Sequence, residues 1–155
     1  MGQCEGTPCQ ELLQSVAQFN RGDWFECHET LEELWVGEKG ELRDFYQGML
    51  QLAVALHHWR NGNFKGALIL LEGGGDLLAR VAPVCLGVDA AALRGAAAAM
   101  HRELSDLGEA RMEELAATFL LQVRLVPQLA SADVRPEPQG KPTGSAGKTG
   151  KGSIA

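Results

Sequence analysis

The chain has 155 residues, of which 45% are hydrophobic and 22% are charged, and its formal net charge is −6. This length suits a single domain with a sizeable core, and the composition is that of an ordinary globular protein. The negative charge argues against nonspecific binding to nucleic acid or to an anionic membrane surface. No apolar run reaches the ~18 residues of a membrane-spanning helix, and the N-terminus carries no pattern of a secretory signal. We therefore expect a cytoplasmic protein that contacts neither nucleic acid nor membrane.

Helical patterns follow one another along most of the chain. Apolar residues recur at the three- and four-residue spacing of a helix, and glycine, asparagine or proline interrupts them. Asp23 and Asp89 stand where they would cap the second and fifth helices. The expected helices span 8–19, 24–36, 41–60, 64–81, 89–107 and 108–127.

The sequence therefore predicts an all-α protein, a compact bundle of five to six helices. Because only Gly37–Gly40 separates the second helix from the third, these two are expected to form an antiparallel central hairpin. The bundle domain should occupy residues 1–130. Residues 131–155 are rich in Gly, Pro, Ser and Lys, and this composition predicts a disordered C-terminal tail.

Three consecutive glycines, Gly73–Gly75, fall inside the expected fourth helix. Together they cost roughly 2–3 kcal/mol relative to alanine by helix propensity. The sequence therefore predicts that this helix kinks or ends early.

The four cysteines show neither a C-x-x-C pair nor the spacing of a zinc site. Without an export signal, a disulfide framework is not expected. Cys27 and Cys85 are instead expected to be buried free thiols that pack as small hydrophobic side chains.

Two polar residues fall on the apolar side of the second helix. On a helical wheel, His28 lies inside the face that Trp24 and Leu31 define, and Glu32 follows one turn later. At positions i and i+4, the two side chains are neighbours, and we expect them to be the most buried polar pair of this helix. Burial of such a pair costs stability unless it finds hydrogen-bond partners.

The third helix offers partners of that kind. It is apolar nearly all round except for a narrow stripe that carries Asp44, Gln47, Gln51 and His58. In an antiparallel hairpin the two glutamines come level with His28 and Glu32, which predicts a shared buried network. A stripe that simply faces water explains the pattern equally well, and the sequence leaves both interpretations open.

These residues also carry a resemblance to a known family. The matching pattern is Phe19-Asn20-x-Gly22-x-x-Phe25-Glu26-x-His28-Glu29-x-x-Glu32-x-x-Trp35, then Arg43-Asp44-Phe45-x-Gln47-Gly48-x-x-Gln51-x-Ala53-x-Ala55-x-x-His58, then Gly62-Asn63-x-x-Gly66-Ala67. Over residues 19–78 the chain resembles domain of unknown function family 309. The resemblance implies a small all-helical bundle and no assigned activity. As candidate site residues it indicates His28, Glu29, Glu32, Gln47, Gln51 and His58.

Two classes of function fit these observations. The first is a non-enzymatic module that binds a protein or peptide partner, with the polar cluster specifying packing or shaping a groove. The alanine-rich fifth helix allows close helix approach, so a homo-oligomer also fits this class. The second class is a metal-dependent or small-ligand-binding protein, including a hydrolase, in which His28 and Glu32 hold a divalent metal.

The sequence favours the first class. The second class lacks an H-E-x-x-H motif and an unambiguous third ligand. No serine or cysteine has an evident catalytic base, so no catalytic residue is assigned. The ligand or reaction, if there is one, does not follow from the sequence.

Overall fold

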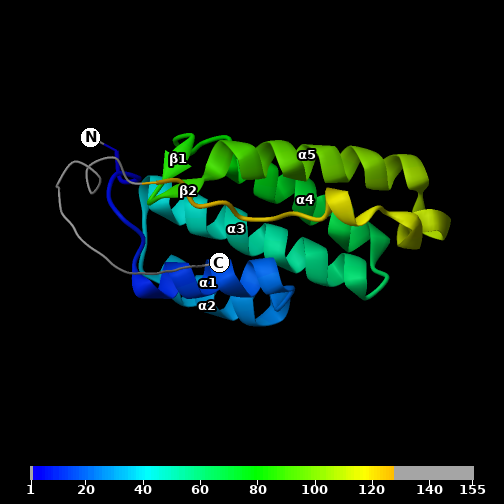
Figure 1. Cartoon of the computed structure of the whole chain (residues 1–155), viewed down its shortest axis with the longest axis horizontal. Coiled ribbons are helices and arrows are strands. Elements are labelled where there is room, and N and C mark those ends of the chain that lie inside the picture. Colours follow the sequence, from blue (N-terminus) through cyan, green and yellow to red (C-terminus); the bar gives the residue numbers. More distant parts are fainter. Residues whose placement is uncertain (1, 128–155) are drawn as a thin grey trace, which may run out of the picture.

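The computed structural model describes residues 2–127 (Figure 1). Its five α-helices are α1 (Gln10–Arg21), α2 (Trp24–Val36), α3 (Gly40–Arg60), α4 (Phe64–Leu78) and α5 (Ala90–Leu107). The two-residue strands β1 (Val84–Cys85) and β2 (Val88–Asp89) form a hairpin before α5, and the short 3-10 helices η1 (Glu109–Glu114) and η2 (Ala117–Phe119) follow it. The expected all-α bundle is therefore confirmed. The boundary at residue 130 and the disordered tail lie outside the described residues and stay predictions.

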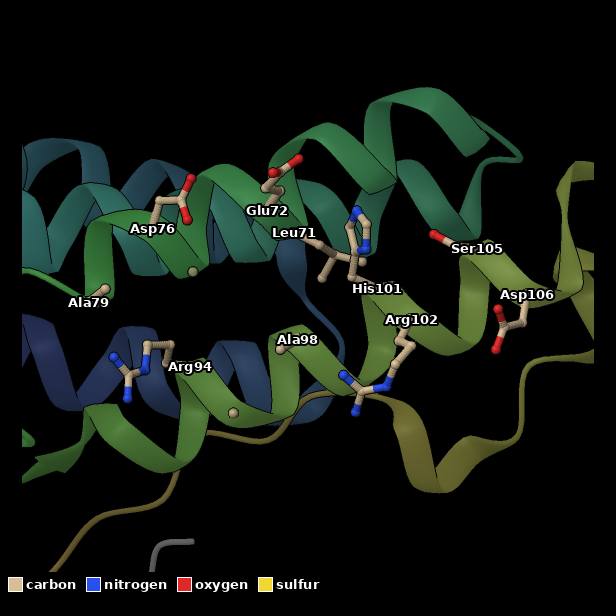
Figure 2. Close-up of a pocket in the computed structure, with 12 residues that line it drawn as sticks. Leu71, Glu72, Asp76, Ala79, Arg94, Ala98, His101, Arg102, Ser105 and Asp106 are labelled. Carbon is tan, nitrogen blue, oxygen red and sulfur yellow. The ribbon is translucent and has the colours of Figure 1, made fainter.

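Helix α3 is the centre of the bundle. It packs against α2 on one side and α4 on the other, while α1 packs on α2 and α5 packs on α4 (Figures 1 and 2). Helices α2 and α3 form the expected antiparallel hairpin. The core around α3 contains large apolar side chains, which include Trp24, Leu31, Phe45, Met49, Leu52 and Leu56, whereas Trp35 and Phe64 are only half-buried. No helix within residues 2–127 is long and apolar enough to cross a membrane.

The helix caps differ from expectation at one position. Asp89 caps α5 as expected, because its Oδ1 accepts a hydrogen bond from the backbone N–H of Ala92 at 3.0 Å. The side chain of Asp23 makes no such bond at the start of α2. Its carboxylate instead accepts a hydrogen bond from Nε of Arg21 at 2.9 Å. Asp23 therefore occupies the N-cap position of α2 as expected, but its side chain pairs with Arg21 and does not cap the helix.

The glycines of α4 have a packing role. The helix runs through Gly73–Gly75 and ends at Leu78, slightly short of the expected residue 81. A Cβ added to Gly74 would lie 2.7 Å from the Leu52 side chain and 2.9 Å from the carbonyl oxygen of Gly48. Glycine at this position lets the backbones of α3 and α4 approach closely, and this tight packing offsets the poor helix propensity.

The expected sixth helix over 108–127 is wrong. After η2 the chain is extended, and the buried Leu121 and Val123 alternate with exposed residues. The Asn20 amide fixes this conformation from α1: its Nδ2 donates to the Val123 carbonyl oxygen at 2.9 Å, and its Oδ1 accepts from the Val123 N–H at 2.7 Å. The extended segment also pairs with β2 through a bridge between Val88 and Leu125. These backbone bonds replace those that a helix would have made.

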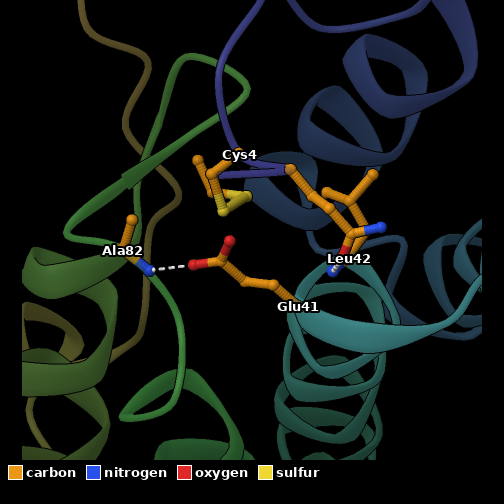
Figure 3. Close-up of a disulfide and its surroundings, with 6 residues drawn as sticks. Cys4, Glu41, Leu42 and Ala82 are labelled. Carbon is orange, nitrogen blue, oxygen red and sulfur yellow. Dashed lines mark hydrogen bonds between the residues drawn. A yellow bond between two sulfur atoms is a disulfide. The ribbon is translucent and has the colours of Figure 1, made fainter. Parts of the chain in front are cut away.

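A disulfide joins Cys4 to Cys85, 81 residues apart in sequence (Figure 3). The expectation of a free thiol at position 85 is therefore wrong, although the residue is buried as expected. Cys27 is a buried free thiol, as expected, and burial raises its pKa to about 12.

The N-terminal segment is held at this end of the bundle by further contacts. Oε1 of Gln3 accepts a hydrogen bond from the Leu42 N–H in the first turn of α3 at 3.0 Å. Next to the disulfide, Oε2 of Glu41 accepts from the N–H of Ala82 at 2.8 Å (Figure 3). The disulfide thus sits among contacts that join three distant parts of the chain.

Two glycine variants test the packing of α4. Gly74→Ala should lower the free energy of unfolding by about 1–3 kcal/mol, because its methyl group overlaps α3. Gly75→Ala is the matched control, since an added Cβ there has nothing within 4 Å. It should raise the free energy of unfolding by about 0.5–1 kcal/mol through helix propensity. Urea denaturation measures both, and equal effects at the two positions would contradict the close approach.

The disulfide should contribute substantially to stability. The double variant Cys4→Ala with Cys85→Ala should lower the free energy of unfolding by about 2–5 kcal/mol, because a long loop in the unfolded chain is no longer closed. Cys9→Ala, which removes an exposed free thiol, should change it by less than about 0.5 kcal/mol. Calorimetry in non-reducing buffer compares the three proteins. A double variant as stable as wild type would show that the bond constrains little.

Candidate functional site

His28 and Glu32 lie side by side at the surface of α2. Nε2 of His28 is 3.9 Å from Oε1 of Glu32, and the exposed fractions of the two side chains are 27% and 54%. The other ring nitrogen of His28, Nδ1, lies 3.3 Å from the carbonyl oxygen of Phe25. Glu29 is exposed as well. The expectation that Glu32 is buried is therefore wrong, because the covered face of α2 is centred on Cys27 and Leu31 instead.

The glutamines of α3 do not reach this pair. Gln47 and Gln51 are both half-buried. A Cβ added to Gly73 would lie 2.5 Å from Oε1 of Gln51, so the Gln51 side chain packs against α4. Within residues 2–127, no hydrogen bond links either glutamine to His28 or Glu32. The predicted hydrogen-bonded network is therefore not formed among the described residues.

His58 supports the start of α4. Its Nδ1 lies 3.4 Å from Nδ2 of Asn63, whose Oδ1 accepts a hydrogen bond from the Gly66 N–H at 2.9 Å. With Oδ1 engaged in this cap, the amide nitrogen of Asn63 is the donor to the imidazole. The ring also lies over Gly66, where an added Cβ would come within 2.9 Å of it. The geometry around His58 is that of a helix cap and its support.

An aromatic residue of α2 links His28 to helix α3. The ring of Phe25, which is 48% exposed, lies 5.5 Å from the His28 ring and 5.8 Å from the His57 ring. Nδ1 of His57 is buried without a hydrogen-bond partner. Phe25 thus joins one histidine of α2 to one of α3. Within residues 2–127, no group of three His, Cys, Asp or Glu side chains is placed to hold a metal ion.

A second candidate site lies elsewhere, between α4 and α5. It is a groove of about 620 Å³ (Figure 2). Its floor is made of small and apolar residues: Leu71, Gly75, Ala79, Gly95 and Ala98. A Cβ added to Gly75 or Gly95 would meet nothing within 4 Å, so the groove is open at both glycines.

The two walls of the groove carry opposite charges along most of their length, and one further acidic residue, Asp106, lies at the end of the α5 side. Glu72 and Asp76 lie on the α4 side, and Arg94 and Arg102 lie on the α5 side (Figure 2). All four residues are exposed. Among residues 2–127, none of the ion pairs joins one wall to the other. The walls therefore present charges that the domain itself leaves uncompensated.

The sequence did not predict this groove, because the groove forms where glycine and alanine replace larger side chains. The helical wheel identifies apolar and polar faces, but two helix faces form a groove only when tertiary packing brings them together. The available signal was the pairing of small residues with arginines in α5, at Arg94-Gly95 and again at Ala98 and Arg102.

The exposure of Glu32 has a measurable consequence. Glu32→Ala should change the free energy of unfolding by no more than about 0.5 kcal/mol, because a solvent-exposed ion pair contributes little. Asn20→Ala provides the contrast, since it leaves the Val123 backbone groups unpaired and should cost about 1–3 kcal/mol. Urea denaturation distinguishes the two. If Glu32→Ala lowered the free energy of unfolding as much as Asn20→Ala, the result would support a buried network at Glu32.

Comparison with known proteins finds two relatives and one family profile that match part of the chain. Over 107 residues it is 34% identical to the uncharacterized protein YpuF of Bacillus subtilis (strain 168), a match that covers 67% of this chain and 51% of that protein. Over 55 residues it is 41% identical to an uncharacterized protein of Aquifex aeolicus (strain VF5), which covers 34% of this chain and 16% of that protein. The chain thus spans about half the length of the first relative and less of the second. The sequence profile of DUF309, a domain of unknown function, matches residues 12–70, which confirms the resemblance over this segment.

Proposed function

We propose that the domain is a non-enzymatic interaction module that binds a helical segment of a protein partner in the α4–α5 groove. The observation that carries the proposal is the pair of oppositely charged walls along a floor of small residues. Charges that face each other across a groove without pairing favour a ligand that carries both signs. Small residues on the floor allow the ligand to approach the two helix backbones closely.

The shape of the groove supports a helix as the occupant. Its lining on α5 extends from Arg94 to Asp106, which is about 18 Å along the helix axis at ~1.5 Å per residue. Roughly three turns of a bound helix fit this length. A bound helix that carries basic side chains on one face and acidic ones on another would place them against α4 and α5 respectively.

The metal-dependent alternative has less support. His28 and Glu32 are adjacent, but a protein site for a divalent transition metal ordinarily has three or more protein ligands. Within residues 2–127 no third acidic, histidine or cysteine ligand lies beside them. The groove offers a larger surface and a defined charge pattern, so the interaction module is the better-supported function.

A designed peptide tests the proposal. The probe is a blocked alanine-rich helical peptide with arginine on one face and glutamate on another. On titration into the ¹⁵N-labelled protein, it should shift the amide resonances of Gly75, Gly95 and Ala98, because these residues form the groove floor. An alanine-rich peptide without charged side chains should bind far more weakly, since it cannot pair with the walls.

Two variants control for the site of binding. Ala98→Leu should block the peptide by filling the groove, whereas Ala91→Leu adds the same side chain to an exposed position of α5 that does not line it. Shifts that survive Ala98→Leu, or that cluster around His28 and Phe25, would show that the groove is not the binding site.

A further inference from the structure

We infer that the partner of the α4–α5 groove is a second copy of this chain, whose own α4–α5 face packs against it; the inference rests on the proposed function. The groove is self-complementary in charge, because its acidic and basic walls belong to the same surface. In a symmetric dimer both copies use the same surface, so each wall must meet its opposite in the partner. One arrangement of the two copies satisfies this condition.

The position of the twofold axis decides which walls meet. When two grooves face each other about an axis that runs along the groove, α4 of one copy lies over α5 of the other. When the axis runs across the groove, α4 lies over α4, and acidic residues face acidic residues. Like charges in direct contact oppose association. The charge pattern therefore selects the axis parallel to the helices.

The levels of the residues agree with this arrangement. In Figure 2, Asp76 lies level with Arg94, and Glu72 lies level with Ala98, one helical turn from Arg102. Rotation about an axis along the groove leaves the position of each residue along the groove unchanged. Asp76 therefore meets Arg94 of the second copy, and Glu72 comes within reach of Arg102 of the second copy. Each contact occurs twice by symmetry. The arrangement thus pairs Glu72 and Asp76 of each copy with the two arginines of the other.

Helix α5 also has the surface that a close helix contact requires. Gly95 and Ala98 are exposed on the face that lines the groove, and the space above Gly95 is open. Small residues at these positions leave no side chain above the surface of α5, so the α4–α5 faces of two copies can approach each other closely. Each chain carries a formal net charge of −6, so association must overcome a general repulsion through this local pairing.

Charge reversal provides the test. In the full chain, Glu72→Arg with Asp76→Arg makes both walls basic, and Arg94→Glu with Arg102→Glu makes both walls acidic. Wild type should have twice the 16.6 kDa of one chain in light scattering coupled to gel filtration. Each double variant alone should run as a monomer, and an equimolar mixture of the two should recover the dimer mass. The control Glu26→Arg with Glu33→Arg changes the net charge by the same amount as Glu72→Arg with Asp76→Arg, but on the exposed face of α2, and it should leave the dimer intact.

Salt dependence gives a second measurement that needs no variant. The wild-type dimer should dissociate more readily at about 1 M ionic strength, where the Debye length falls to ~3 Å. Circular dichroism confirms that each variant keeps its helices, as expected for substitutions at exposed positions.

The outcomes separate this inference from the proposed function. A monomeric wild type, double variants that still dimerise alone, or a mixture that stays monomeric would overturn the second copy as the occupant. If the designed peptide still shifts the groove resonances in that case, the interaction module stands with a different partner. If neither the peptide nor a second copy binds, both proposals fail.

Discussion

The close approach of α3 and α4 is the constraint on which the rest of the bundle depends. Helix α3 is apolar on nearly every side, so it must be covered by neighbours along its length. At Gly48 and Gly74 the two backbones come so close that a methyl group would not fit. This contact fixes the position of α4, and α4 in turn supports α5. The face of α4 that lines the groove is therefore positioned by the glycine contact that α4 makes with α3 on its other side.

Much of the helical framework could be predicted from the sequence, because local signals define it. Periodicity and turn residues correctly predicted α2 from Trp24 to Val36 and α5 from about Asp89 to Leu107. The extended segment near Val123 could not be predicted in this way. Its own residues are compatible with a helix, and the side chain that holds it extended is Asn20, 103 positions earlier. The disulfide of Cys4 was missed for the same reason, since its partner is distant in sequence.

The site was less predictable than the fold. A helical wheel correctly placed His28 and Glu32 as neighbours, but it does not show which arc of α2 another helix covers. Cys27 and Leu31 occupy that arc, which leaves Glu32 in solvent. The groove is a harder case, because its shape comes from side chains that are absent at Gly75 and Gly95. Where atoms are lacking, hydrophobic patterns give no signal, and only the packed arrangement of helices reveals the opening.

The Cys4–Cys85 bond makes a covalent ring of the chain from the N-terminal segment to β1, and this ring encloses α1 to α4. The segment matched by DUF309, residues 12–70, lies wholly inside the ring, whereas every residue that lines the groove comes after it. The α4 wall of the groove is part of this ring. The α5 wall lies outside it and is connected to it through the β1–β2 hairpin. The width of the groove therefore depends on how α5, which lies outside the ring, packs against α4.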